Sequence, residues 1–146
     1  MTHIPGFEEG GREPRFDRDA AIGYQGELYL DNLIQSLKDG TVEVKTDERA
    51  SVTGNCYFEY CCRLSDGWQP SGIASTESAL WLHVIARRIG LVLPVDLLRP
   101  VCRVARGEGR KIRGGTDGGN PTMGVVLPLH LLLGRLITEA RQRNGT

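Results

Sequence analysis

The sequence has no excess of charge of either sign and no long apolar run. Its 146 residues include 18 lysines and arginines and 18 aspartates and glutamates, so the formal net charge is +0. This balance excludes a uniformly basic nucleic-acid-binding protein, although a neutral total is compatible with a local basic patch. The longest apolar stretch, MGVVLPLHLLLG, is too short to span a bilayer and contains Pro128 and His130.

A signal peptide and a regular cysteine pattern are also missing. The N-terminal segment MTHIPGFEEGGREPRFDRD is polar and lacks the apolar centre of a secretory signal. Cys56, Cys61, Cys62 and Cys102 form neither a CxxC pair nor a Cys/His zinc spacing. We expect reduced thiols in the core, and the alternative is a zinc site built from Cys56, Cys61 or Cys62 with His83. The protein is expected to be cytoplasmic, with no membrane association.

The length suits one domain, which we place at residues 16–146 behind a flexible tail at residues 1–15. Apolar residues at helical spacing predict a helix from Asp17 to about Leu37, which ends before Gly40. Strands are predicted at about 41–46 and 56–62, joined as an antiparallel hairpin by a polar segment that ends in Thr-Gly-Asn.

The second half of the chain predicts further strands and two helices. LWLHVIA and LVLP have the character of strands, and helices are expected at about 95–106 and from Leu129 to Arg143. Between these helices, RGEGRKIRGGTDGGNPTMG is expected to be a long glycine-rich loop, followed by the strand VVL. The order predicts a mixed α/β or α+β domain around one sheet.

Charged residues alternate along the first predicted strand. Since a strand repeats every two residues, Glu43, Lys45 and Asp47 share one face, and an antiparallel hairpin would bring Glu59 next to Glu43. Two carboxylates could hold Mg²⁺, which takes oxygen ligands and keeps waters for a substrate phosphate. A lysine beside them would stabilise charge on that phosphate, as phosphodiester hydrolysis requires.

An ordinary hairpin with one solvated face accounts for the same alternation, with Glu59 opposite Lys45. Asp47 at the strand end is interpreted mainly as a turn-initiating residue, with metal binding as the alternative. His83 has the position of a strand residue. Of the two tryptophans, Trp68 is the better candidate for stacking on a base.

Three segments in order, VEVKTD, TGNCYFEY and PSGIASTESALWLHV, resemble phage and prophage proteins of the PD-(D/E)XK nuclease superfamily. This superfamily includes restriction-type enzymes and Holliday junction resolvases. The resemblance extends upstream to YQGELYLDNLI and covers most of residues 16–130. It implies a restriction endonuclease-like core and cleavage of DNA, including branched or repair intermediates, with Mg²⁺ or Mn²⁺. It also implies a phage or prophage protein in a bacterial cytoplasm.

The resemblance implies roles for individual residues. Glu27 matches the acidic position on the superfamily's first helix, and Glu43 with Lys45 matches its ExK pair. In that alignment, however, no aspartate-bearing strand precedes the pair.

If Glu43 instead takes the first acidic position, Glu59 becomes the second, and Cys61 stands where the lysine belongs. Lys45 would then reach in from the neighbouring strand. We prefer this version, with Glu43 and Glu59 as metal ligands, Lys45 as the catalytic lysine and Glu27 as an outer or water-mediated ligand.

DNA contacts are expected from the glycine-rich loop, which combines positive charge with a backbone that can approach phosphates closely. A solvated loop is the alternative. Two residues flanking the predicted hairpin are further candidates for phosphate contacts. The complete set is Arg106, Arg110, Lys111, Arg113, Asn55 and Ser71.

Two broader hypotheses concern assembly and activity. The apolar face of the last helix could form a homodimer interface as readily as a core face. The competing function is a catalytically inactive nuclease fold that binds DNA or another protein, with Cys61 in the lysine position as its sign.

Overall fold

The computed structural model describes residues 14–117 and 119–145, and the chain divides into two compact units, Met1–Asp39 and Gly40–Thr146. The described part of the first unit is helix α1 (Pro14–Lys38), so the helix predicted there is confirmed. Gly40 follows it with a φ of 69°, a left-handed conformation that glycine adopts without steric cost. Of the expected tail, residues 1–13 lie outside the described residues.

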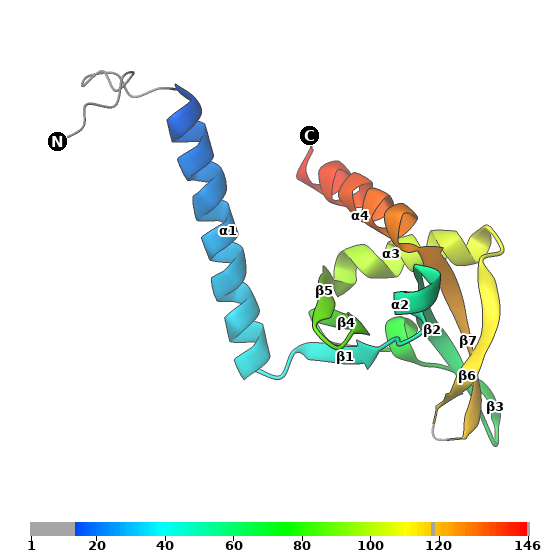
Figure 1. The fold of residues 1–146 in the computed structure, drawn as a ribbon. Helices are drawn as coiled ribbons and strands as arrows, with labels where there is room; N and C mark the ends of the chain where they lie inside the picture. The colour runs from blue at the N-terminus through cyan, green and yellow to red at the C-terminus, as the bar shows by residue number, and fades with distance from the viewer. Residues whose placement is uncertain (1–13, 118, 146) are drawn as a thin grey trace. The chain divides into compact units, whose positions relative to one another are not determined.

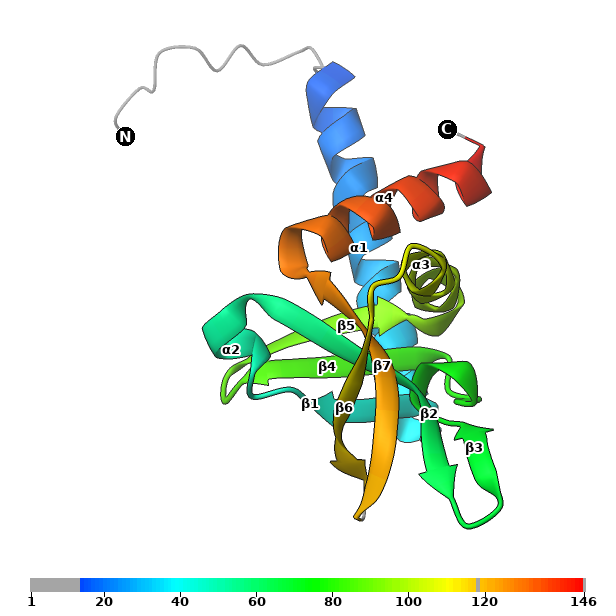
Figure 2. The same cartoon turned by 90° about the vertical axis from the view of Figure 1, so that its right-hand side faces the viewer.

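The second unit contains two sheets (Figures 1 and 2). The smaller sheet has the order β1-β4-β5, in which β1 runs parallel to β4 and β4 antiparallel to β5. Its strands are β1 (Val42–Thr46), β4 (Leu80–Ala86) and β5 (Ile89–Pro94).

The larger sheet is antiparallel throughout and has the order β3-β2-β7-β6. Its strands are β2 (Asn55–Leu64), β3 (Gly67–Pro70), β6 (Lys111–Asp117) and β7 (Asn120–Pro128). In Figure 2 its central strands cross those of the smaller sheet steeply. The mixed α+β class is therefore confirmed, although the residues form two sheets rather than one.

Short helical segments connect the strands, and two longer helices pack on each other and on β7 (Figure 2). The helical elements are α2 (Ala50–Thr53), the 3₁₀ turn η1 (Gly72–Ala74), α3 (Val95–Gly107) and α4 (Leu129–Asn144). The helices predicted at 95–106 and from Leu129 are thus confirmed. In the described residues, no helix combines the length and apolar character that crossing a membrane requires.

The core lies between the two sheets and the helix pair. Alternate residues of β2 are buried, as expected for a strand with one face against a core. Phe58 is fully buried, and its ring centroid lies 6.0 Å from that of Trp81 in the other sheet. Leu98 of α3 and Leu132 of α4 are also fully buried. Burial of these large side chains holds the sheets and helices together.

The predicted hairpin of the first two strands is wrong. In the structure β1 pairs with β4, and β2 pairs with β3 and β7, so Glu43 lies opposite Trp81 and Glu59 opposite Gly124. The connecting segment forms the helical turn α2, which ends at Gly54 with a φ of 70°. Because it is not a tight hairpin turn, it leads the chain from one sheet into the other.

The predicted glycine-rich loop is also wrong over most of its length, because β6 and β7 form an antiparallel hairpin there. Two of its glycines provide space for the ring of Tyr57. A Cβ built on Gly114 or Gly124 would overlap this ring at a distance that real Cβ atoms do not reach. The glycines are therefore required by close packing within a sheet rather than by a flexible loop.

Candidate active site

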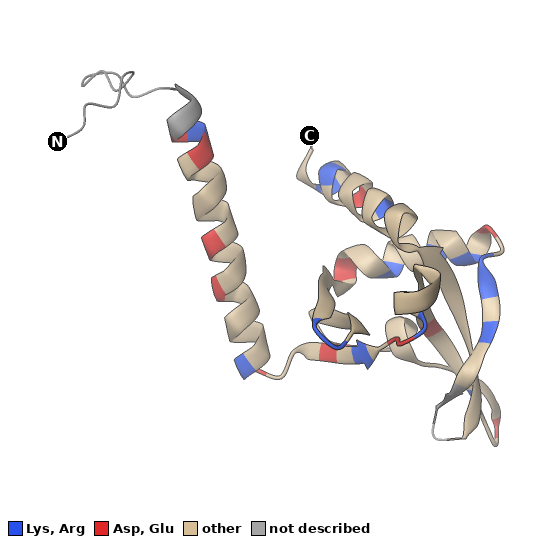
Figure 3. Cartoon of the chain, in the orientation of Figure 1, with Lys and Arg blue, Asp and Glu red and all other residues tan. Residues whose placement is uncertain are grey.

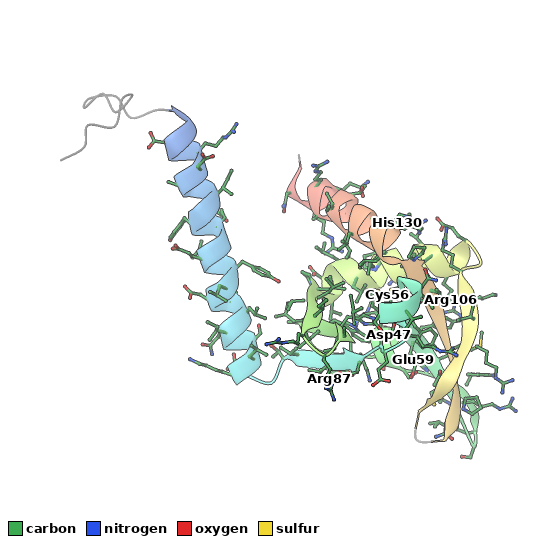
Figure 4. All side chains as sticks on the ribbon, viewed as in Figure 1. Asp47, Cys56, Glu59, Arg87, Arg106 and His130 are labelled. Atoms are coloured by element: carbon green, nitrogen blue, oxygen red, sulfur yellow. The ribbon has the colours of Figure 1, made fainter. Side chains whose placement is uncertain are left out.

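A cavity of about 540 Å³ opens between the end of β1, β2, β4 and the β6–β7 hairpin. Both sheets contribute charged or titratable side chains to its lining. These are Lys45, Asp47, Glu48, Arg49, Tyr57, Glu59 and His83. Figure 4 labels Asp47 directly after β1 and Glu59 on β2, the two carboxylates that come from different sheets.

Asp47 connects four elements at one end of the cavity. Its Oδ1 accepts a hydrogen bond of 3.2 Å from the backbone N–H of Ala50 at the start of α2. Its Oδ2 accepts one of 2.8 Å from the backbone N–H of Tyr57 in β2 and lies 3.2 Å from Nε2 of His83 in β4. Asp47 therefore caps the turn after β1, as expected, and also lines the cavity.

The tautomer of His83 follows from its two partners. The indole N–H of Trp81 can only donate, and it donates to Nδ1 of His83 at 3.2 Å. The proton of the neutral imidazole must then lie on Nε2, from which it is donated to Asp47. His83 is only 1 % exposed, and burial lowers its pKa although the nearby Asp47 carboxylate opposes this shift. His83 therefore acts as a neutral support that orients Asp47.

Lys45 and Glu43 form an ion pair on the same face of β1. Nζ of Lys45 lies 3.0 Å from Oε1 of Glu43. The other carboxylate oxygen accepts a hydrogen bond of 3.4 Å from the hydroxyl of Thr76. Lys45 lines the cavity, whereas Glu43 is not among its lining residues. Glu43 thus holds the ammonium group from the side.

Glu59 is held by the segment Ser71–Thr76, which we call the bridging segment. The Ser71 hydroxyl donates a hydrogen bond of 2.6 Å to Oε1 of Glu59. Gly72, with a φ of 50°, lies so close that a Cβ there would overlap the backbone carbonyl oxygen of Glu59. Because Thr76 contacts Glu43, this one segment touches carboxylates from both sheets.

Arg99 of α3 holds the bridging segment from the helical side. Its Nε donates to the carbonyl oxygen of Ile73 at 3.0 Å, and its Nη2 donates to that of Thr76 at 2.5 Å. Hydrogen bonds from a charged donor are stronger than those between neutral groups. The segment is therefore fixed at both ends, which sets the positions of the carboxylates it contacts.

Tyr57 forms part of the cavity wall. The Thr122 hydroxyl donates its single proton to the carbonyl oxygen of Gly115 at 3.0 Å, so the Tyr57 hydroxyl donates to Thr122, also at 3.0 Å. Burial, as the largest cause, raises the pKa of Tyr57, so its phenol is protonated at neutral pH. This wall presents hydrogen-bonding groups without charge.

The structure brings together only some of the predicted catalytic residues. Lys45 and Glu59 line one cavity, and Glu43 adjoins it through its ion pair with Lys45. Glu27 belongs to α1 in the first unit. Asp47 is expected from sequence mainly as a turn residue, although its alternation with Glu43 and Lys45 is the signal that points to its place in the cavity.

The predicted DNA-contacting residues are dispersed over several elements, and Figure 3 shows lysines and arginines on α3 and β6 among them. Arg106 is in the last turn of α3, with its guanidinium carbon 4.2 Å from the ring centroid of Tyr60. Arg110 follows this helix, and its Nε lies 3.5 Å from Oε2 of Glu108. The other four occupy β6, the start of β2 and the bridging segment. They are Lys111, Arg113, Asn55 and Ser71.

The donor set is partly suited to a hard divalent cation. Across residues 14–117 and 119–145, no group of three His, Cys, Asp or Glu side chains converges as a metal site. The cavity does contain the carboxylates of Asp47 and Glu59, and Mg²⁺ is commonly held by one or two carboxylates together with waters and substrate phosphates. The lining thus supplies carboxylates that such a cation could use, among them Asp47 and Glu59, although both oxygens of Asp47 also accept hydrogen bonds from the protein.

No protein-family model, curated protein or solved structure matches this chain.

Proposed function

We propose that this protein is a metal-dependent DNA endonuclease of the PD-(D/E)XK type. The observation that carries the proposal is the shared cavity of Lys45, Asp47 and Glu59, which are supplied by two different sheets. A lysine beside two carboxylates is the set of groups that phosphodiester hydrolysis needs near a phosphate. The restriction endonuclease-like core belongs to the same proposal.

Asp47 and Glu59 would hold the metal, Mg²⁺ or Mn²⁺. When bound, such an ion polarises a phosphoryl oxygen and lowers the pKa of a coordinated water. This assignment differs from the pair expected from sequence, because Glu43 is engaged with Lys45 at the side of the cavity. Glu27 lies on α1 of the first unit and is left out of this assignment.

The other residues would stabilise charge on the phosphate or hold the reacting side chains in position. The ammonium group of Lys45 would stabilise negative charge that develops on the phosphate, and Glu43 keeps this group in place. Trp81 and His83 orient Asp47 through a chain of two hydrogen bonds. The Ser71 hydroxyl orients Glu59 in the same way, through one hydrogen bond. Each reacting group is thus held by a buried or half-buried partner.

The decisive experiment measures cleavage of supercoiled and branched DNA in Mg²⁺ or Mn²⁺ by the full chain. Lys45→Ala, Asp47→Asn and Glu59→Gln are each expected to lower the rate by about 100-fold. Glu77→Gln changes an exposed carboxylate outside the cavity lining and is expected to retain full activity.

Wild-type rates in all three cavity variants would refute the assignment of the site. If wild-type protein binds DNA but cleaves none of these substrates with either metal, the inactive DNA-binding module becomes the better description. Circular dichroism of each variant separates loss of a reacting group from loss of the fold.

A further inference from the structure

A second cavity, of about 150 Å³, lies beneath α3 and next to the bridging segment. Tyr60 of β2 lines it, whereas the preceding residue, Glu59, lines the first cavity. The alternation of buried and half-buried residues along β2 continues through these two positions, so they point to opposite faces of the larger sheet, and no residue lines both cavities. The second cavity is therefore separate from the proposed active site.

Three arginines of α3 line this second cavity: Arg99, Arg103 and Arg106. Their spacing of four and three residues places them along one side of the helix. No aspartate or glutamate is among the lining residues. Burial raises the pKa of the remaining titratable helix residue, Cys102, to about 12, so its thiol is uncharged at neutral pH. The cavity therefore concentrates positive charge without an acidic lining residue to balance it.

Two of the guanidinium groups are held in fixed positions. Arg99 is fixed by the carbonyl oxygens of Ile73 and Thr76, which engage its Nε and Nη2. Arg106 lies over the ring of Tyr60, with its guanidinium carbon 4.2 Å from the ring centroid. This cation–π contact leaves the guanidinium N–H groups able to donate to an oxyanion.

The volume of about 150 Å³ suits a small group. A single tetrahedral phosphate with a few waters fits this space. Arginine forks match the oxygens of phosphate in geometry as well as charge.

We propose that Arg99, Arg103 and Arg106 form a binding site for a single phosphate group, distinct from the cavity of Lys45, Asp47 and Glu59. The group is either inorganic phosphate or a terminal phosphate ester, or it is one backbone phosphate of a nucleic acid. The chemistry that recognises it is the same in both cases. Through Arg99, the site also contacts the segment that holds Glu59 and Glu43.

The test titrates inorganic phosphate into the full-length protein by isothermal calorimetry, at constant ionic strength in chloride. Wild type is expected to bind one phosphate, and Arg103→Gln and Arg106→Gln are each expected to weaken binding by about tenfold. Arg87→Gln removes the same charge from an exposed position outside the cavity lining and is expected to bind as wild type does. Figure 4 labels Arg87 and Arg106.

Absence of binding, or equal weakening by Arg87→Gln and the cavity variants, would overturn the proposal. A second titration, with a short single-stranded oligonucleotide lacking terminal phosphates, identifies the source. If Arg103→Gln weakens oligonucleotide binding as much as phosphate binding, the site takes a backbone phosphate. If it weakens only phosphate binding, the site takes a free or terminal phosphate. Neither readout depends on DNA cleavage, so both remain valid if the proposed nuclease activity fails.

Discussion

The hydroxyl of Ser71 donates a hydrogen bond of 2.6 Å to Oε1 of Glu59, so a residue of the bridging segment fixes the carboxylate that the larger sheet contributes to the cavity. Ser71→Ala removes this charge-assisted bond. We expect a loss of about 1.5–3 kcal/mol in the free energy of unfolding and a clear fall in DNA cleavage. Ser75→Ala, at an exposed position in the same segment, is the matched control and should change neither. Equal behaviour of the two variants in urea unfolding and cleavage assays would contradict this role.

His83 predicts a pH-dependent stability. Its pKa in the folded protein is lowered from 6.5, chiefly by burial, so the unfolded chain takes up a proton at a pH where the folded protein does not. The stabilising contribution is therefore complete above pH 6.5 and declines as the pH falls below this value towards the lowered pKa.

Urea unfolding between about pH 5 and about pH 8 measures this dependence. His83→Gln should flatten the curve below pH 6.5. His130→Gln, at an exposed histidine, is the matched control. An unchanged slope in His83→Gln would assign the acid sensitivity to other groups.

Trp81→Phe keeps an aromatic ring against Phe58 but removes the N–H that donates to Nδ1 of His83. The imidazole then carries a buried acceptor without its donor, which costs about 1–3 kcal/mol. Trp68→Phe, where the side chain is 43 % exposed, should stay within about 0.5 kcal/mol of wild type. Similar unfolding free energies for the two variants would show that the bond contributes little.

Glycine-to-alanine substitutions should have opposite effects at two sites. At Gly72, with a φ of 50°, a new Cβ would overlap the carbonyl oxygen of Glu59, and we expect a loss of about 2 kcal/mol or more. At Gly134 in α4, a new Cβ meets open space, and improved helix propensity should add about 0.5–1 kcal/mol. If both substitutions changed the free energy of unfolding in the same direction, this distinction would be refuted.

Lys111 and Arg113 share one face of β6, an edge strand of the larger sheet. If DNA phosphates contact them, the double variant Lys111→Gln/Arg113→Gln should reduce the slope of log affinity against log salt by about 2. Fluorescence anisotropy with labelled duplex at several salt concentrations measures this slope. Arg87→Gln is the control, and a double variant with the wild-type slope would remove these residues from the interface.

Much of the secondary structure follows from the sequence because it depends on local periodicity. The helices at α1, α3 and α4 and the strands at β1, β2 and β4 were all indicated by the spacing of apolar residues. The β6–β7 hairpin was missed because its glycines suggested a loop. Those glycines are explained by the ring of Tyr57, which comes from a strand about sixty residues earlier in the chain and leaves no local signal.

The charged residues lead to the same conclusion: the sequence predicts which face of a strand they occupy, but not which strands lie next to each other. By itself, the sequence indicated that Glu43 and Lys45 share a strand face, that Asp47 continues their alternation, and that Glu59 lies on another strand. Only the tertiary structure decided that these strands belong to different sheets, that Glu43 pairs with Lys45, and that Asp47 joins Glu59 in the cavity. Alternation defines which side of a strand a residue occupies, whereas strand partners are chosen by the burial of whole faces far apart in sequence.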